Sequence, residues 1–183
     1  MFDSVAPSQQ RLRPAWPLVF ALTPSEPSFA GRAHRVIDNS ARVPASPEQV
    51  YDEFTELAHG AEWLDQFLHI DLHTPEAPPD RRIYTETLTF MSVRFHVCEA
   101  ERGRRWVASI DSCSLPLAAQ MLQEVTFEPM DDGSTLFRWR IHYTPSRLTR
   151  PVLGTLEPLL GGLFKRSTEQ LATFFQNPQR GQA

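Results

Sequence analysis

Residues 134–144 alternate between large apolar and polar side chains. One set is apolar and mostly aromatic, namely Phe137, Trp139, Ile141 and Tyr143. The intervening set is polar, namely Arg138, Arg140 and His142. Because successive side chains of a strand point to opposite faces, this pattern predicts a strand whose aromatic face is buried.

Similar alternation, broken by Gly, Pro or paired Asp, continues through residues 68–144. It predicts further strands at 69–73, 81–90, 93–100, 104–111 and 119–129, and a looser pattern predicts a first strand at 34–43. Asp132 followed by Gly133 is typical of a tight hairpin turn. The sequence therefore predicts seven antiparallel strands joined mostly by short turns.

Two short helices are predicted directly after the first strand. Ser46 is a suitable N-cap, Pro47 fits the first helical position, and Gln49 completes a capping box. Apolar residues then repeat at helical spacing, namely Val50, Phe54 and Leu57. Residues 61–67, which include Trp63, favour a second short helix.

A long amphipathic helix is predicted from about residue 147 to residue 176, where apolar residues recur close to helical spacing. Pro158 removes one backbone donor, so a bend is expected there. Gly161 and Gly162 have two interpretations. The preferred one is a kinked packing helix, and the alternative is that the small residues open space beneath it.

Length and composition favour one domain. The chain has 183 residues and a formal net charge of −4 at pH 7, which disfavours nucleic-acid binding. Five of the 16 prolines lie within the first 30 residues. This clustering predicts an extended arm over 1–33, a globular domain over 34–177 and a tail over 178–183.

The cysteines and the N-terminal arm give indications of the cellular compartment and the oligomeric state. Cys98 and Cys113 form no CxxC pair, so buried free thiols in a reducing compartment are expected. Pro17 interrupts the apolar run 15–22, and no stretch approaches the roughly 18 apolar residues that span a bilayer. We expect a cytoplasmic protein without a membrane span. Monomer and homodimer both stay open, since apolar residues of the arm can pack on the domain or on a second subunit, namely Trp16, Val19, Phe20 and Leu22.

Glu86 is the titratable residue of most chemical interest. If Tyr84 and Leu88 point inward, Glu86 does so as well, and burial would raise its pKa toward the range of general acid–base catalysis. Tyr143 is a second catalytic candidate, because its hydroxyl can supply a hydrogen bond beside Glu86. A register shifted by one residue would instead place threonines inside, namely Thr85, Thr87 and Thr89, and the sequence leaves this choice open.

Other motifs favour no specific chemistry. His69, Asp71 and His73 would share one strand face, but residues four apart on a strand are roughly 13 Å apart, so a solvated polar face is preferred to a metal site. The basic segment 102–105 lies at a predicted turn. No phosphate-binding loop, dinucleotide fingerprint or nucleophile elbow is present. No metal or other cofactor is expected.

The order of one strand, two short helices, six strands and a long helix resembles the START-like (SRPBCC) superfamily, which includes polyketide cyclases, lipid-transfer proteins and plant pathogenesis-related proteins. The segment ARVPASPEQVYDEF, followed by Trp63, is similar to the opening strand and helices of that family. The resemblance covers about residues 35–176. It implies an α+β helix-grip fold, in which a curved antiparallel sheet wraps the C-terminal helix around an elongated cavity.

Two functions follow from the resemblance. The first is binding of a hydrophobic or polycyclic small molecule, such as a lipid or a polyketide-like metabolite, between the sheet and the helix. The second is a cyclase or aromatase that uses a buried acid or base for aldol closure and loss of water. A third hypothesis is a regulatory or dimerisation module that uses the arm. The expected cavity-lining residues are Trp63, Tyr84, Glu86, Leu88, Phe90, Trp106, Gln123, Val125, Phe127, Trp139, Tyr143, Leu160 and Phe164.

Overall fold

The computed structural model describes residues 19–176. Trp16, the first residues of the apolar run and the tail 178–183 lie outside the described residues. The elements in chain order are β1 (Phe20–Ala21), η1 (Pro27–Gly31), β2 (Arg35–Val43), α1 (Pro47–Thr55), η2 (Leu57–His59), α2 (Gly60–Trp63), β3 (Phe67–Leu72), η3 (Pro79–Arg81), β4 (Ile83–Leu88), β5 (Ser92–Glu101), β6 (Arg105–Cys113), β7 (Ala118–Pro129), β8 (Thr135–Pro145), η4 (Arg150–Val152) and α3 (Leu153–Gln176).

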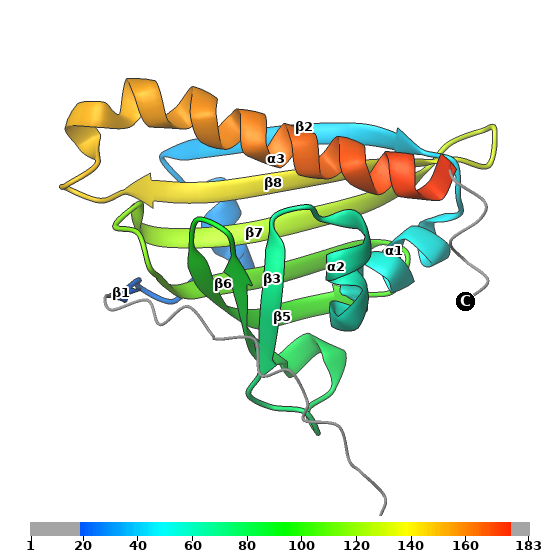
Figure 1. Cartoon of the computed structure of the whole chain (residues 1–183), viewed down its shortest axis with the longest axis horizontal. Helices are drawn as coiled ribbons and strands as arrows, with labels where there is room; N and C mark the ends of the chain where they lie inside the picture. The colour runs from blue at the N-terminus through cyan, green and yellow to red at the C-terminus, as the bar shows by residue number, and fades with distance from the viewer. Residues whose placement is uncertain (1–18, 177–183) are drawn as a thin grey trace, which may run out of the picture.

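One antiparallel sheet carries the fold, with the strand order β2-β8-β7-β6-β5-β4-β3. Helix α3 runs along the sheet over β2 and β8, and α1 and α2 lie near its C-terminal end (Figure 1). The hydrophobic core fills the space between the concave face and these helices. The chain is therefore an α+β protein with the helix-grip fold that the sequence predicted, and the seven predicted strands are all present.

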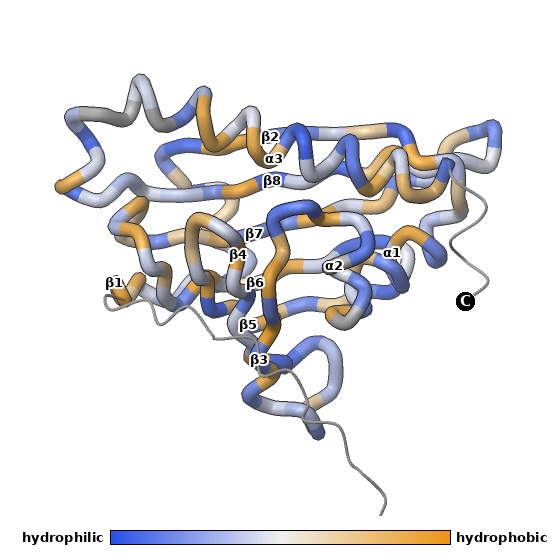
Figure 2. Tube along the Cα trace, in the orientation of Figure 1, coloured by the Kyte–Doolittle hydropathy of each residue, from blue (hydrophilic) through white to orange (hydrophobic). Residues whose placement is uncertain are grey.

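The alternation along β8 sets which side chains enter the core. Phe137, Trp139, Ile141 and Tyr143 are all buried. Antiparallel pairing sets Trp139 opposite Val125 of β7, so the apolar faces of the two strands are continuous. Along α3, groups of hydrophobic residues alternate with groups of hydrophilic residues (Figure 2). Leu171 lies on the side of this helix that packs against the core.

Helix α1 begins as predicted. The Ser46 hydroxyl accepts a hydrogen bond from the Gln49 backbone N–H, and the Gln49 side chain accepts one from the Ser46 N–H. Pro47 occupies the first turn, where its missing donor costs nothing. At the same end of the sheet, Gly133 has φ +80° in the turn between β7 and β8, a conformation that favours glycine.

The start of α3 differs from the prediction. The helix begins at Leu153 after a 3-10 turn, whereas the spacing of apolar residues predicted a start near residue 147. Side-chain bonds hold the preceding loop: the Thr149 hydroxyl donates to the Leu117 carbonyl (2.9 Å) and the Ser146 hydroxyl to the Pro116 carbonyl (2.7 Å). Such local bonds compete with helical ones.

The described part of the arm packs against the sheet. β1 pairs with β6 and adds an eighth strand, which the sequence did not predict. Phe29 in η1 is buried against Val107 and Leu122 on the convex face. Leu22 joins the main core, whereas Val19 is exposed. Residues 19–33 thus cover part of the face that α3 does not reach.

A charged cluster lies on the convex face beside this segment. Glu124 accepts hydrogen bonds from Arg105 (3.1 Å) and lies 2.9 Å from Nε2 of the buried His142. These partners, together with Arg140, hold the pKa of Glu124 near 2. Within residues 19–176, no helix is long and apolar enough to cross a membrane.

Candidate ligand-binding site

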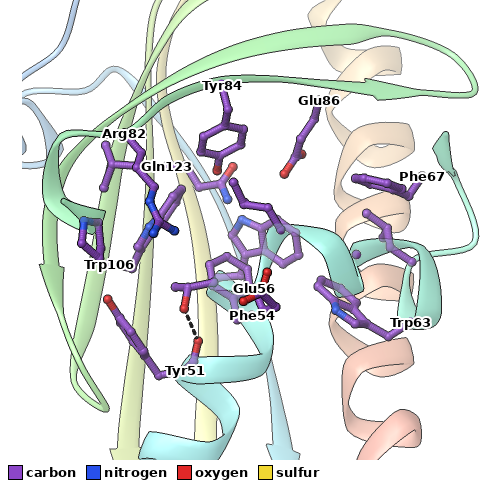
Figure 3. A pocket seen from close by; sticks show the side chains of 17 residues that line it. Tyr51, Phe54, Glu56, Trp63, Phe67, Arg82, Tyr84, Glu86, Trp106 and Gln123 are labelled. Atoms are coloured by element: carbon purple, nitrogen blue, oxygen red, sulfur yellow. Dashed lines mark hydrogen bonds between the residues drawn. The ribbon is translucent and has the colours of Figure 1, made fainter. Parts of the chain in front are cut away.

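Two adjoining cavities lie between the concave face of the sheet and the helices. The α3 chamber lies beneath α3 and has a predominantly apolar lining, contributed by Ile37, Leu64, Gln66, Glu86, Leu88, Phe90, Met91, Val93, Phe95, Ile110, Cys113, Leu117, Met121, Gln123, Trp139, Ile141, Tyr143, Leu160, Leu163, Phe164 and Ser167. The α1–α2 chamber is lined by Tyr51, Phe54, Thr55, Glu56, Leu57, Gly60, Trp63, Leu64, Phe67, Pro79, Arg82, Tyr84, Glu86, Val97, Trp106, Gln123 and Trp139 (Figure 3).

The two chambers share four lining residues, namely Leu64, Glu86, Gln123 and Trp139. The centres of water molecules can occupy about 60 Å³ in the α3 chamber and about 50 Å³ in the α1–α2 chamber. One water needs about 10–15 Å³ by this measure, so each chamber holds a few waters. A larger ligand therefore has to displace side chains of the lining as it enters.

Glu86 lies at the junction of the chambers. Its strand β4 pairs with β3 and β5, so that Glu86 is opposite Ile70 and Val93. In this register Glu86 points into the cavity with Tyr84 (Figure 3). Burial raises the pKa of Glu86 from its usual 4.5 to about 7. The carboxyl group is therefore about half protonated at neutral pH.

Two indole groups in the α1–α2 chamber have unused donors. The Nε1 atoms of Trp63, from α2, and of Trp139, from β8, are buried and have no hydrogen-bond partner within residues 19–176. Both side chains are more than nine-tenths buried and line this chamber. Trp106 from β6 completes a set of three tryptophans around the same space.

Among the described residues of the two linings, Arg82 alone has a basic side chain. It lies between η3 and β4, where its carbonyl accepts a hydrogen bond from the Val97 N–H (2.8 Å). Its Nε atom is buried without a partner in the described part of the chain. Its side chain extends toward the chamber that Trp106 and Gln123 line (Figure 3).

Tyr143 reaches α3 from the last strand. Its hydroxyl donates a hydrogen bond to Glu157 Oε1 (2.6 Å), and Glu157 is also 3.7 Å from Arg35. Burial and this carboxylate raise the pKa of Tyr143 well above its ordinary value. The hydroxyl is therefore bound to α3, whereas the Tyr143 ring lines the α3 chamber.

Most of the expected cavity residues line one chamber or both. Glu86, Gln123 and Trp139 line both chambers. Trp63, Tyr84 and Trp106 line the α1–α2 chamber alone, and the α3 chamber alone is lined by Leu88, Phe90, Tyr143, Leu160 and Phe164.

Val125 and Phe127 line neither chamber, contrary to the prediction. Both are buried, and the Phe127 ring packs against Tyr51 and Phe54 at centroid distances of 5.3 and 6.1 Å. Alternation correctly placed the two residues on the concave face. However, α1 covers that end of β7 and fills the space in front of them.

Several lining residues were not predicted. Val93 and Phe95 alternate along β5, so the period-two pattern already contained the signal for them. Gln66 and Ser167 are different, because the Gln66 side chain donates to the Ser167 hydroxyl (2.8 Å) across 101 residues. Arg82 lies at the end of a turn, where no periodicity indicates the direction of a side chain.

The polar residues of β3 and the following His73 have separate partners. His69 Nε2 lies 3.0 Å from Asp71 Oδ1, whereas His73 Nε2 lies 2.8 Å from the Thr85 hydroxyl. Within residues 19–176, no three His, Cys, Asp or Glu side chains are grouped so as to hold a metal ion.

The sequence matches a known family over most of its length. Residues 34–176 match a family described as polyketide cyclase/dehydrase and lipid transport. No curated protein matches the chain.

Solved structures share the fold at low sequence identity. An uncharacterised protein of Bacillus thuringiensis is 16% identical, with a TM-score of 0.63, over 78% of this chain and 100% of that one. The di-domain ARO/CYC BexL from the BE-7585A biosynthetic pathway is 14% identical, with a TM-score of 0.66, over 78% of this chain and 46% of that one. A START superfamily protein of Mycobacterium smegmatis is 12% identical, with a TM-score of 0.54, over 74% and 98%.

Proposed function

Because the chain belongs to the polyketide cyclase/dehydrase and lipid-transport family, we propose that it binds a hydrophobic small molecule in the α3 chamber and the adjoining α1–α2 chamber. The observation that carries this proposal is the lining of the α3 chamber. It is mainly aliphatic and aromatic, with a few polar groups such as Glu86, Gln123 and Gln66. Small-molecule sites have this composition, because apolar contacts supply affinity and few polar groups fix orientation.

The limited free volume supports binding that is coupled to movement of the lining. Met91 and Met121 line the α3 chamber, and methionine side chains adapt to irregular shapes. Gly161 and Gly162 lie in the same part of α3 as Leu160 and Leu163, which line the chamber. A helix segment with two glycines is less stable than one with alanines, which lowers the cost of its displacement.

A fluorescent probe tests the binding site directly. N-phenyl-1-naphthylamine is an uncharged apolar fluorophore, and we expect it to bind the protein. Leu163→Trp places a larger side chain in the α3 chamber and should weaken this binding at least tenfold. Leu159→Trp is the matched control, since Leu159 is 62% exposed one turn earlier on α3 and lines neither chamber.

Two results would contradict the proposal. One is the absence of probe binding together with the absence of any copurified apolar molecule in native mass spectrometry. The other is equal loss of binding in the Leu159 and Leu163 variants, which would show that the probe does not report on the chamber.

A cyclase or aromatase is the second candidate function, and Glu86 is the observation that favours it. A carboxyl group with a pKa of about 7 can accept a proton from the carbon between two carbonyl groups and return a proton to a leaving hydroxyl. Aldol closure needs one such relay, in which the proton taken from the carbon is returned to the oxygen of the attacked carbonyl group as the new C–C bond forms. Loss of water needs a second relay, which takes another proton from the same carbon and delivers it to the leaving hydroxyl. Glu86→Gln should then abolish cyclisation of a synthetic poly-β-ketone thioester while probe binding persists. Unchanged turnover in this variant would exclude the enzymatic role of Glu86.

A further inference from the structure

The α1–α2 chamber contains donors that lack acceptors. The Nε1 atoms of Trp63 and Trp139 and the Nε atom of Arg82 are all buried without a partner in the described part of the chain. The three residues come from α2, β8 and the end of the η3 turn, yet they line one chamber (Figure 3). Buried donors in folded proteins are nearly always paired with protein or with bound water. Each of these donors therefore indicates an acceptor on an occupant of the chamber, which Arg82 and Trp63 border from different sides (Figure 3).

Arg82 differs from the other arginines of the described chain. Eight of them form ion pairs with Asp or Glu. Five others are exposed, so water solvates them. Within residues 19–176, Arg82 alone is partly shielded from solvent and has no carboxylate partner. The pairing of arginine with planar oxyanions is strong and frequently bidentate, so the missing partner of Arg82 is best supplied by an anionic group.

The acidic groups near this chamber leave the Arg82 guanidinium group available to bind a ligand. Glu86 lies at the far junction, and no effect of Arg82 contributes to its pKa. Glu56 lines the chamber from an exposed position beside α1 and makes contacts of its own. The α1–α2 chamber adjoins the α3 chamber, with which it shares the lining residues Leu64, Glu86, Gln123 and Trp139. A molecule that spans both would place a polar head near Arg82 and an apolar body beneath α3.

We propose that the ligand is an amphipathic carboxylic acid, whose carboxylate binds Arg82 in the α1–α2 chamber while its apolar body occupies the α3 chamber. This inference rests on the proposed binding function and specifies the class of ligand. The two oxygens of a carboxylate match the paired N–H donors of a guanidinium group.

Paired ligands and variants test the inference. Decanoate and 1-decanol have the same chain length and differ in the charge of the head group, and each can be titrated against bound N-phenyl-1-naphthylamine. We expect the wild-type protein to bind decanoate at least tenfold more tightly than decanol at about pH 6, where the acid is largely ionised. Arg82→Gln should weaken decanoate binding at least tenfold and leave decanol binding unchanged.

Arg81→Gln is the matched control, because Arg81 is an exposed neighbour that lines neither chamber. Decanol binding by Arg82→Gln also shows that this variant is folded.

The outcomes separate this inference from the proposed function. Equal affinity of the wild-type protein for decanoate and decanol overturns the carboxylate assignment and leaves apolar binding intact. Failure of both molecules and of the fluorophore to bind overturns the two proposals together. Equal loss of decanoate binding in the Arg81 and Arg82 variants would show that net charge alone, and not the chamber, attracts the acid.

Discussion

Replacing Glu86 by glutamine is expected to remove most of a decrease in stability between about pH 5 and pH 8. Burial raises the pKa of Glu86 from 4.5 to about 7 in the folded protein. Below pH 4.5 the carboxyl group is mainly protonated in both the folded and the unfolded states. Above it, the unfolded state loses the proton first, so the free energy of unfolding falls until the folded state also ionises above about pH 7.

The size of the effect follows from the same two values. At about 1.4 kcal/mol per pKa unit, the full loss amounts to about 3 kcal/mol. Urea unfolding of the wild-type protein and of Glu86→Gln, measured at about pH 5 and pH 8, gives the difference in pH dependence between them. Any cost of burying the amide is the same at both pH values and cancels. Glu76→Gln, at an exposed position, should retain the wild-type pH dependence. Parallel pH dependence of the wild-type protein and Glu86→Gln would refute the burial of an ionisable carboxyl group at this position.

Four further substitutions test how individual side chains contribute to the free energy of unfolding, and the first of them also tests ligand binding. Phe127→Ala should lower the free energy of unfolding by about 3–5 kcal/mol, since the ring is 2% exposed, while the protein that remains folded binds the fluorophore with unchanged affinity. Phe29→Ala should cost about 3 kcal/mol in urea unfolding, because the ring covers the convex face, and no loss would mean that the arm is not docked in solution. Tyr143→Phe removes the hydrogen bond to Glu157 and should cost about 1 kcal/mol. Gly162→Ala should raise the unfolding free energy by about 0.5–1 kcal/mol, because a Cβ atom there meets no atom within 4 Å, and a decrease would contradict the open space at this position.

The period of the side chains was sufficient to predict the strands and the main helix. Along β8, strict alternation gave both the strand and its buried face, because a strand with one face in a core needs apolar residues at every second position. At α1, Ser46, Pro47 and Gln49 specified the first turn through bonds between neighbours in the sequence. Such features depend on residues within a few positions of one another, so no tertiary information was needed.

For Glu86, the local sequence was not sufficient to predict the direction of the side chain. Its strand carries both a bulky face and a threonine face, and local pattern alone permitted either to be buried. Pairing of Glu86 with Ile70 and Val93 on the neighbouring strands decides the register. Only this arrangement makes the carboxyl group titrate near pH 7.

The amino-acid sequence by itself therefore determined the order of the seven main strands and the helices, the concave faces of β7 and β8, and the START-like architecture. Tertiary structure decided which inward residues border open space: Val125 and Phe127 share a face with Gln123, but α1 packs over them, whereas Gln123 borders both chambers. It also decided the place of Arg82, which a turn brings to the chamber that the indole groups of α2 and β8 also line. The physical reason is that periodicity reports the direction of a side chain relative to its own element. A cavity depends on what other elements leave unfilled.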